Sequence, residues 1–246
     1  KATTVKKGRP KIPLQIEDEE SSPNLLDKNR QESPEEAARK NNRSSGVSAN
    51  LATASAINLA SETLVLNNVD EVQTGRGADT LVGGTNADVL FAGSGNDTVT
   101  AGAGNDWVDG GAGNDTYTLT GNITGSQIFS GQGDDSVAVA GTITDSLIQD
   151  IYGTNRHSIA TANNTTVIGG SGVDTVQITN AASNGTLIRA AEGNDSISIT
   201  GTYTGSSVFG GEGDDTLLIT GVATNSQFQD ENGNNIFNIA NTAYGS

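Results

Sequence analysis

The chain has 246 residues, of which only 33% are hydrophobic and 4% aromatic, while 32 are glycine. This composition argues against the thick core of a compact enzyme and favours a thin apolar layer repeated many times. The formal net charge is −16, and residues 46–246 carry three Lys/Arg against 21 Asp/Glu, a net of −18. A segment this acidic repels nucleic acid and anionic membranes and attracts cations.

Several kinds of chemistry lack their residues here. The chain has no cysteine, which excludes disulfides, thiolate nucleophiles and soft metal sites. His157 is the only histidine, so neither a catalytic triad nor a zinc site can be assembled, and we expect no enzyme activity. We interpret His157 as an inward-facing spacer. No apolar run approaches the roughly 18 residues of a membrane span, and the N-terminus lacks the apolar run of a signal peptide. We therefore expect neither membrane insertion nor classical export.

Residues 1–45 form a polar segment that contains all four prolines of the chain and is too hydrophilic to fold alone. We interpret it as an extended arm or linker that docks on a partner. Within it, Ser33-Pro34-Glu35-Glu36 predicts a short helix near 33–42, with Ser33 as N-cap and Glu36 closing a capping box. Residues 46–73 then predict lead-in strands or a cap, because small residues are followed by an alternation at Leu64 and Leu66.

From residue 74 to residue 118 a nonapeptide recurs five times without a gap. The copies are "TGRGADTLV", "GGTNADVLF", "AGSGNDTVT", "AGAGNDWVD" and "GGAGNDTYT". Each begins with six small or turn-forming residues and ends in three residues with an apolar one at the eighth place. A glycine-rich turn followed by such a short strand predicts a narrow parallel coil with the eighth side chain inward. The predicted inward residues are Leu81, Leu90, Val99, Val108 and Tyr117.

Residues 119–246 repeat the pattern in a degenerate form with units of about 20 residues. One turn of each coil is preserved, and its last residue recurs at Asp135, Asn155, Asp174, Asp195, Asp215 and Asn235. The other turn, for example "GNITGS" or "GTYTGS", lacks the motif, and we expect hydrogen bonds to close it. The predicted fold is therefore all-β, a parallel β-roll or β-helix solenoid preceded by an extended, partly helical N-terminal arm.

An aspartate that recurs once per coil makes a ladder of carboxylates, since neighbouring strands lie about 4.7 to 4.9 Å apart. Two unit charges about 4 Å apart repel by roughly 4 kcal/mol at an effective dielectric near 20. Ca²⁺ relieves this repulsion, because it takes about six to eight oxygen ligands and glycine turns expose carbonyls. A merely solubilising face is the alternative, but solubility requires no fixed register. The predicted metal ligands are Asp79, Asp88, Asp97, Asp106, Asp115, Asp135, Asp174, Asp195 and Asp215.

The turns alternate between two edges of the solenoid, so Asp88 and Asp106 should lie on one edge and the other predicted ligands on the opposite one. Asn155 and Asn235 stand where a carboxylate is expected, and their turns lack the double glycine. We expect weak or empty sites there and a full column of ions only near residues 79–135.

The pattern Gly-Gly-x-Gly-x-Asp-x-apolar-x resembles the RTX (repeats-in-toxin) calcium-binding β-roll family. The resemblance is strict over residues 74–118 and degenerate over 119–240. It implies a parallel β-roll that folds on binding Ca²⁺, in proteins exported unfolded by type I secretion and folded outside the cell. The "TGSSVFGGEGDD" coils resemble more loosely the 20-residue degenerate coils of large surface proteins and phage fibre proteins associated with cyanobacteria.

Three function classes remain open on these observations. The first is a structural or adhesive module outside a cell, in a surface layer, filament or virion appendage. Such a module would self-associate or join a larger assembly through residues 1–45 and the solenoid ends. The second is the repeat segment of a type I-secreted RTX enzyme or toxin whose catalytic domain lies outside this chain. The third is a polysaccharide-binding solenoid, which the single Trp107 and the three Lys/Arg after residue 45 disfavour.

Overall fold

The computed structural model describes residues 48–50, 63–65, 72–74 and 76–243. The predicted arm at 1–45 and its helix near 33–42 lie outside these residues. Within them every regular element is a β-strand, and no helix suited to crossing a membrane occurs.

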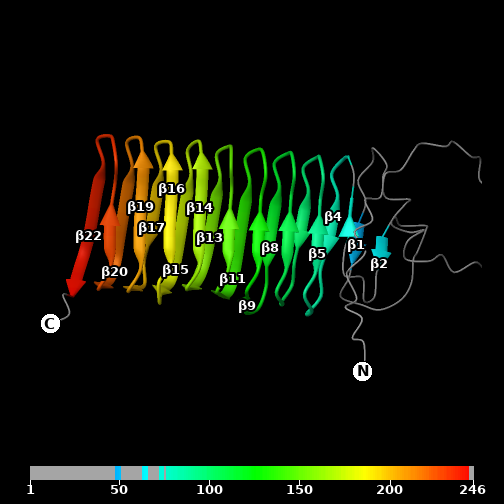
Figure 1. Ribbon diagram of the computed structural model, residues 1–246, viewed down its shortest axis with the longest axis horizontal. Helices are drawn as coiled ribbons and strands as arrows, with labels where there is room; N and C mark the ends of the chain where they lie inside the picture. The colour runs from blue at the N-terminus through cyan, green and yellow to red at the C-terminus, as the bar shows by residue number, and fades with distance from the viewer. Residues whose placement is uncertain (1–47, 51–62, 66–71, 75, 244–246) are drawn as a thin grey trace, which may run out of the picture. The chain divides into compact units, whose positions relative to one another are not determined.

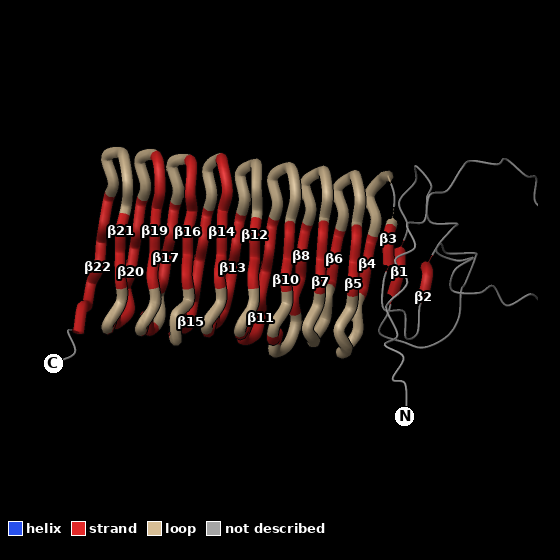
Figure 2. Tube along the Cα trace, in the orientation of Figure 1, coloured by secondary structure: helices blue, strands red, loops and turns tan. Residues whose placement is uncertain are grey.

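The strands form two sheets in which every pairing is parallel, and the chain winds from one sheet to the other coil after coil (Figures 1 and 2). Sheet A contains β1 (Ser48–Asn50), β2 (Thr63–Val65), β4 (Thr80–Val82), β6 (Thr98–Thr100), β8 (Thr116–Leu119), β9 (Ile123–Thr124), β11 (Ser136–Thr144), β13 (Arg156–Asn163), β15 (Thr175–Ser183), β17 (Ser196–Ile199), β18 (Thr202–Thr204), β20 (Thr216–Thr224) and β22 (Ile236–Ala243). Sheet B contains β3 (Val72–Gln73), β5 (Val89–Phe91), β7 (Trp107–Asp109), β10 (Gln127–Phe129), β12 (Leu147–Gln149), β14 (Thr166–Ser171), β16 (Leu187–Glu192), β19 (Ser207–Glu212) and β21 (Gln227–Gln229). The predicted all-β parallel solenoid is confirmed.

Strand register follows the sequence period. In sheet A, Thr80 pairs with Thr98 and Thr98 with Thr116, so two nonapeptides make one coil. Thr116 then pairs with Ser136 and Ser136 with Arg156, which sets the longer coils.

Each coil has two turns. Those that lead from sheet B into sheet A, at residues 74–79, 92–97, 110–115, 130–135, 150–155, 169–174, 190–195, 210–215 and 230–235, form what we call the aspartate edge. Those that lead from sheet A into sheet B form the opposite edge.

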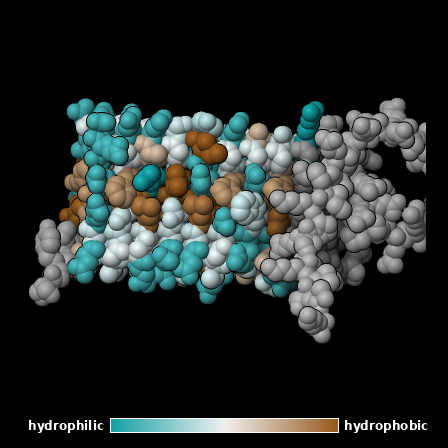
Figure 3. Space-filling model, in the orientation of Figure 1, coloured by the Kyte–Doolittle hydropathy of each residue, from teal (hydrophilic) through white to brown (hydrophobic). Residues whose placement is uncertain are grey.

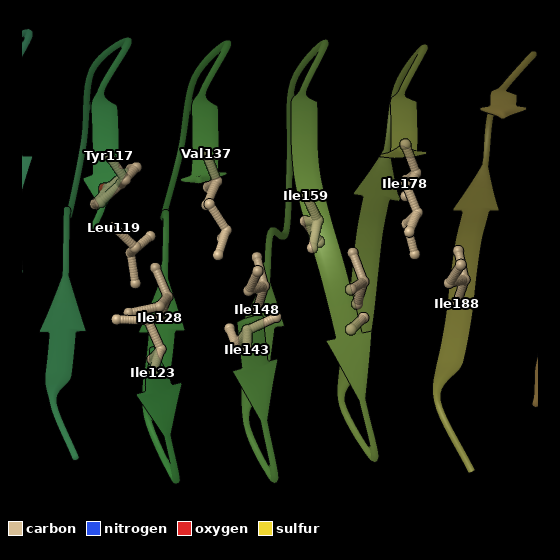
Figure 4. Packing of buried hydrophobic residues seen from close by; sticks show 14 of the residues in the cluster. Tyr117, Leu119, Ile123, Ile128, Val137, Ile143, Ile148, Ile159, Ile178 and Ile188 are labelled. Carbon is tan, nitrogen blue, oxygen red and sulfur yellow. The ribbon is translucent and has the colours of Figure 1, made fainter. Parts of the chain in front are cut away.

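The core is a stack of inward side chains between the two sheets. All five predicted inward residues, from Leu81 to Tyr117, are at most 1% exposed. Short three-residue strands bury only their central side chain, as in β5 and β7, which explains why an apolar residue is needed at just one place in nine. Figure 4 shows the stack continuing through the later coils.

The 20-residue coils bury more apolar volume than the nonapeptide coils. The coil that begins at Ser136 buries Val137, Val139, Ile143 and Ile148. The coil that begins at Thr98 buries, apart from Ala101, only Val99 and Val108. In Figure 4 Ile143 lies beside Ile148 in the interior. The added residues thus replace a glycine-rich turn of the opposite edge by an apolar corner, and a fully buried Ile contributes about 1.5–3 kcal/mol.

Glycine is required where adjacent coils touch through their backbones. Gly113, at the fourth place of its turn, has a φ of +136°, and a Cβ atom there would collide with the carbonyl of Gly95 one coil earlier. A side chain would therefore both strain the backbone and separate the coils.

We predict that Ile148→Ala lowers the free energy of unfolding of the calcium-saturated protein by about 2–5 kcal/mol, because it leaves a cavity in a fully buried layer. Urea unfolding followed by circular dichroism measures the change. The matched control is Gln149→Ala, the next residue of β12, whose side chain points away from the core. Equal losses in the two variants would contradict the assignment of the core.

Candidate calcium-binding turns

Backbone hydrogen bonds join the turns of the aspartate edge, and one hydrogen bond to the side chain at the sixth place recurs in every coil. Oδ1 of Asp97 accepts a bond from the backbone N–H of Asp79 at 2.7 Å, and Oδ1 of Asp115 accepts one from Asp97 at 2.8 Å. The same bond, at 2.7–2.9 Å, recurs at Asp135, Asn155, Asp174, Asp195, Asp215 and Asn235. An amide oxygen accepts as a carboxylate does, so Asn155 and Asn235 preserve the ladder while lacking its charge.

The second carboxylate oxygen is the unsatisfied one. The aspartates of this ladder are at most 3% exposed. Among the described residues, no hydrogen bond reaches the buried Oδ2 of Asp97, Asp135, Asp174, Asp195 or Asp215. Asp115 differs, because the Tyr117 hydroxyl donates to its Oδ2 at 3.3 Å. Buried carboxylate oxygens without donors are costly unless a cation pairs with them.

A backbone carbonyl lies close to the unsatisfied oxygen. The Cβ position of Gly169, the first residue of its turn, would be 2.5 Å from Oδ2 of Asp174 and 2.7 Å from the carbonyl oxygen of Ala190. Ala190 is the first residue of the next turn, so oxygens from two coils converge beside a residue without a side chain. No group of three His, Asp or Glu side chains in the described ranges is placed to hold a metal alone. An ion here would need carbonyl ligands, and this mixed oxygen set fits Ca²⁺.

The opposite edge begins with the same hydrogen bond from a backbone N–H to an Asp carboxylate, and its later coils use a hydroxyl as the acceptor. Oδ1 of Asp106 accepts a bond from the N–H of Asp88 at 3.0 Å, and Oδ2 of Asp88 accepts one from Gly84. Further along, Oγ of Ser126 accepts from Asp106 and Oγ of Ser146 accepts from Ser126. Similar backbone-to-hydroxyl bonds reach Thr186 and Ser226. The expectation that hydrogen bonds close these turns is confirmed.

The hydroxyl ladder was not predicted residue by residue. Its signal lies in the residue before each sheet B strand, which is Ser or Thr in "GNITGS", "GTITDS" and "GTYTGS" as it is Asp in the nonapeptides. A hydroxyl both accepts and donates: Ser146 Oγ, for example, donates to the Thr144 carbonyl at 2.7 Å. Such rungs carry no charge and need no cation.

His157 has a partner that sequence reasoning missed. Its side chain points inward and is fully buried, as expected, but it is more than a spacer. Nε2 lies 3.1 Å from Oδ2 of Asp150, and both side chains are buried. Asp150 is the first residue of the turn that ends at Asn155. A close contact between a buried imidazole and a buried carboxylate therefore stands in the coil where the ladder lacks its carboxylate. The available signal was an Asp at the first place of the turn "DIYGTN".

Burial raises the pKa of the predicted ligands, and repulsion between neighbouring carboxylates adds to the effect. It raises the pKa to about 6 for Asp97, Asp106, Asp115 and Asp174, and to about 7 for Asp135 and Asp195. Burial also raises the pKa of Asp88 and Asp215. The hydrogen bonds to Oδ1 oppose the shift without cancelling it. At neutral pH the metal-free ladder is therefore electrostatically strained.

Comparison with known protein families agrees with this geometry. Residues 67–99, 82–117 and 200–218 match the family model described as RTX calcium-binding nonapeptide repeat (4 copies). The solenoid carries RTX repeats. The matches cover the strict nonapeptides and one of the 20-residue coils, so the resemblance seen in the sequence is confirmed. RTX nonapeptide repeats bind calcium and are typical of secreted proteins. Searches of curated proteins and of solved structures gave no match.

The raised pKa values predict an unusual pH dependence. Between about pH 4 and about pH 7 the metal-free folded chain binds more protons than the unfolded chain, so its stability falls as the pH rises. We expect the calcium-depleted protein to show more β-structure by circular dichroism at about pH 5 than at about pH 7.5. In saturating Ca²⁺ the order should reverse, because protons compete with the ion. A calcium-depleted protein that is more stable at the higher pH would contradict the strained ladder.

Proposed function

We propose that the chain is a calcium-stabilised structural or adhesive module that works outside a cell, in a surface layer, filament or virion appendage. The observation that carries this proposal is the row of buried carboxylates whose Oδ2 atoms lack donors. The described residues contain three arginines and His157 as basic side chains, and His157 lies beside Asp150. Within that part of the chain, no arginine donates a hydrogen bond to the Oδ2 atoms of Asp97, Asp135, Asp174, Asp195 or Asp215.

The proposed ligands are the nine predicted aspartates, together with carbonyls of the turns. Seven of the aspartates fall into two runs on the aspartate edge, from Asp79 to Asp135 and from Asp174 to Asp215. Asn155 separates the runs. The second run has the same Oδ1 bonds and the same donor-free Oδ2 atoms as the first. We therefore extend the proposed ion column beyond residue 135, while Asp88 and Asp106 form a short column on the opposite edge.

The outer faces of the two sheets support a structural role with a partner. Outward positions of sheet A are largely Thr and Ser, such as Thr80, Thr98 and Thr116. Outward positions of sheet B include Val89, Phe91, Trp107, Phe129, Leu147, Ile168, Leu187 and Phe209. Figure 3 shows a band of apolar side chains along the face turned to the viewer. Trp107 packs on Phe129 with ring centroids 4.9 Å apart. A partly exposed apolar band of this kind suits adhesion or assembly.

The primary test is a Ca²⁺ titration of the full chain followed by far-ultraviolet circular dichroism, with Mg²⁺ as control. We expect a cooperative gain of β-structure with Ca²⁺ and none with Mg²⁺, because Mg²⁺ demands octahedral geometry and retains its waters. A β spectrum that a chelator leaves unchanged would contradict the proposal and make the ladder a solvated acidic face.

Assembly is tested separately, by sedimentation velocity in saturating Ca²⁺. We propose that residues 1–45 and the solenoid ends mediate association, so the full chain should form larger species than a chain that lacks residues 1–45. Circular dichroism of both chains controls for folding. Equal sedimentation of the two would count against the arm as an assembly element and favour the repeat segment of a secreted RTX enzyme or toxin.

A further inference from the structure

Two turns of the aspartate edge have a carboxylate at their first place instead of their sixth place. Both turns that end in Asn, at Asn155 and Asn235, begin with Asp, at Asp150 and Asp230. The described turns that end in Asp begin instead with a small or hydroxyl residue, namely Thr74, Ala92, Gly110, Ser130, Gly169, Ala190 or Gly210. Where the sixth place of a turn is Asn, the first place of the same turn is therefore Asp.

The carboxylate of Asp230 lies close to that of Asp215, which is the sixth-place residue of the preceding coil. The Cβ position of Gly210 would lie 2.5 Å from Oδ2 of Asp215, 2.6 Å from Oδ2 of Asp230 and 2.7 Å from Oδ1 of Asp230. At Gly169 the corresponding point is flanked by one carboxylate oxygen and one carbonyl. Three carboxylate oxygens, one from Asp215 and two from Asp230, therefore converge beside a residue without a side chain, and carboxylate oxygens are ligands that Ca²⁺ prefers.

Both carboxylates are held in place without a neutralising partner. Asp215 is 3% exposed, and its Oδ2 accepts no hydrogen bond from the described residues. Oδ1 of Asp230 accepts bonds from the N–H of Gly211 at 2.8 Å and of Glu231 at 3.0 Å, which fix its orientation. Two adjacent carboxylates with a buried, donor-free oxygen between them are unfavourable when both are charged, and a bound cation relieves that repulsion.

The other first-place carboxylate, Asp150, has a neighbouring side chain that Asp230 lacks. Asp150 is paired with His157, which follows two residues after Asn155. The strand register places Val137 opposite His157 in one coil pair and Leu217 opposite Phe237 in the other. Phe237 thus occupies the place of His157 and offers no charge. Asp150 thus has an imidazole beside it within its own coil, whereas Asp230 has no basic side chain at the corresponding place.

We propose that Asp215 and Asp230 form a Ca²⁺ site in which a first-place carboxylate replaces the carbonyl and sixth-place ligands of the ordinary turn. The site rests on the proposed calcium function and deepens it. It differs from the expectation of a weak or empty site at Asn235, because the turn has a carboxylate at its first place. The Asp150 turn, paired with His157, holds no ion and divides the ion column.

The test places a sensitiser beside the site in the full chain. Gln229 is exposed and precedes Asp230, so Gln229→Trp in a Trp107→Phe background gives one tryptophan next to the site. Tb³⁺ serves as the probe ion and Ca²⁺ as its competitor. We expect tryptophan-sensitised Tb³⁺ emission that Ca²⁺ abolishes. Adding Asp230→Asn should reduce the apparent affinity at least tenfold. Adding Glu231→Gln, which removes an equal charge one residue further along, should leave it unchanged.

Absence of sensitised emission, or equal effects of the two charge variants, would overturn the proposal. Should Asp230→Asn fail to fold, the double variant Asp230→Gly with Asn235→Asp returns the carboxylate to the sixth place and should retain the signal. The Ca²⁺ response in circular dichroism is measured on the same proteins. Loss of emission with that response intact would reject this site alone, whereas loss of both would reject the calcium function.

Discussion

The bond from a backbone N–H to a side-chain oxygen one coil later is the constraint on which the solenoid depends. It ties each turn to the next and demands an acceptor at the residue before the strand. Asp, Asn, Ser and Thr all meet this demand, but only Asp leaves a second, charged oxygen in a buried place. The choice of acceptor therefore decides how much uncompensated charge each coil carries.

The solenoid relieves that charge in different ways along its length. In its later coils the opposite edge has hydroxyls in place of carboxylates and adds buried residues such as Ile123 and Ile143. These turns carry no charge to neutralise, and apolar packing stabilises them. The aspartate edge keeps its carboxylates. In one coil the His157 imidazole lies beside Asp150. Under the proposed function, the ions would therefore lie mainly along one edge, in a column interrupted once.

This distribution gives the proposed function a physical basis. A ladder of buried acids with raised pKa values is unfavourable at neutral pH without an ion and favourable with one. Such a chain would remain unfolded where calcium is scarce and fold where it is plentiful. That behaviour suits export followed by folding outside the cell, and it uses the same interaction that holds the coils in register.

The sequence by itself determined the period, the inward residues from Leu81 to Tyr117, the all-β solenoid and the row of aspartates. Each of these follows from the residue pattern of one nonapeptide and from its repetition. It did not determine the pairing of Asp150 with His157, the meeting of Asp215 and Asp230, or the hydroxyl ladder through Ser126. These depend on which residues of different turns or strands face one another. Only the stacking of coils of unequal length decides that, since local irregularities such as the one between Ile159 and Thr161 absorb a change of length and restore the register of the later contacts.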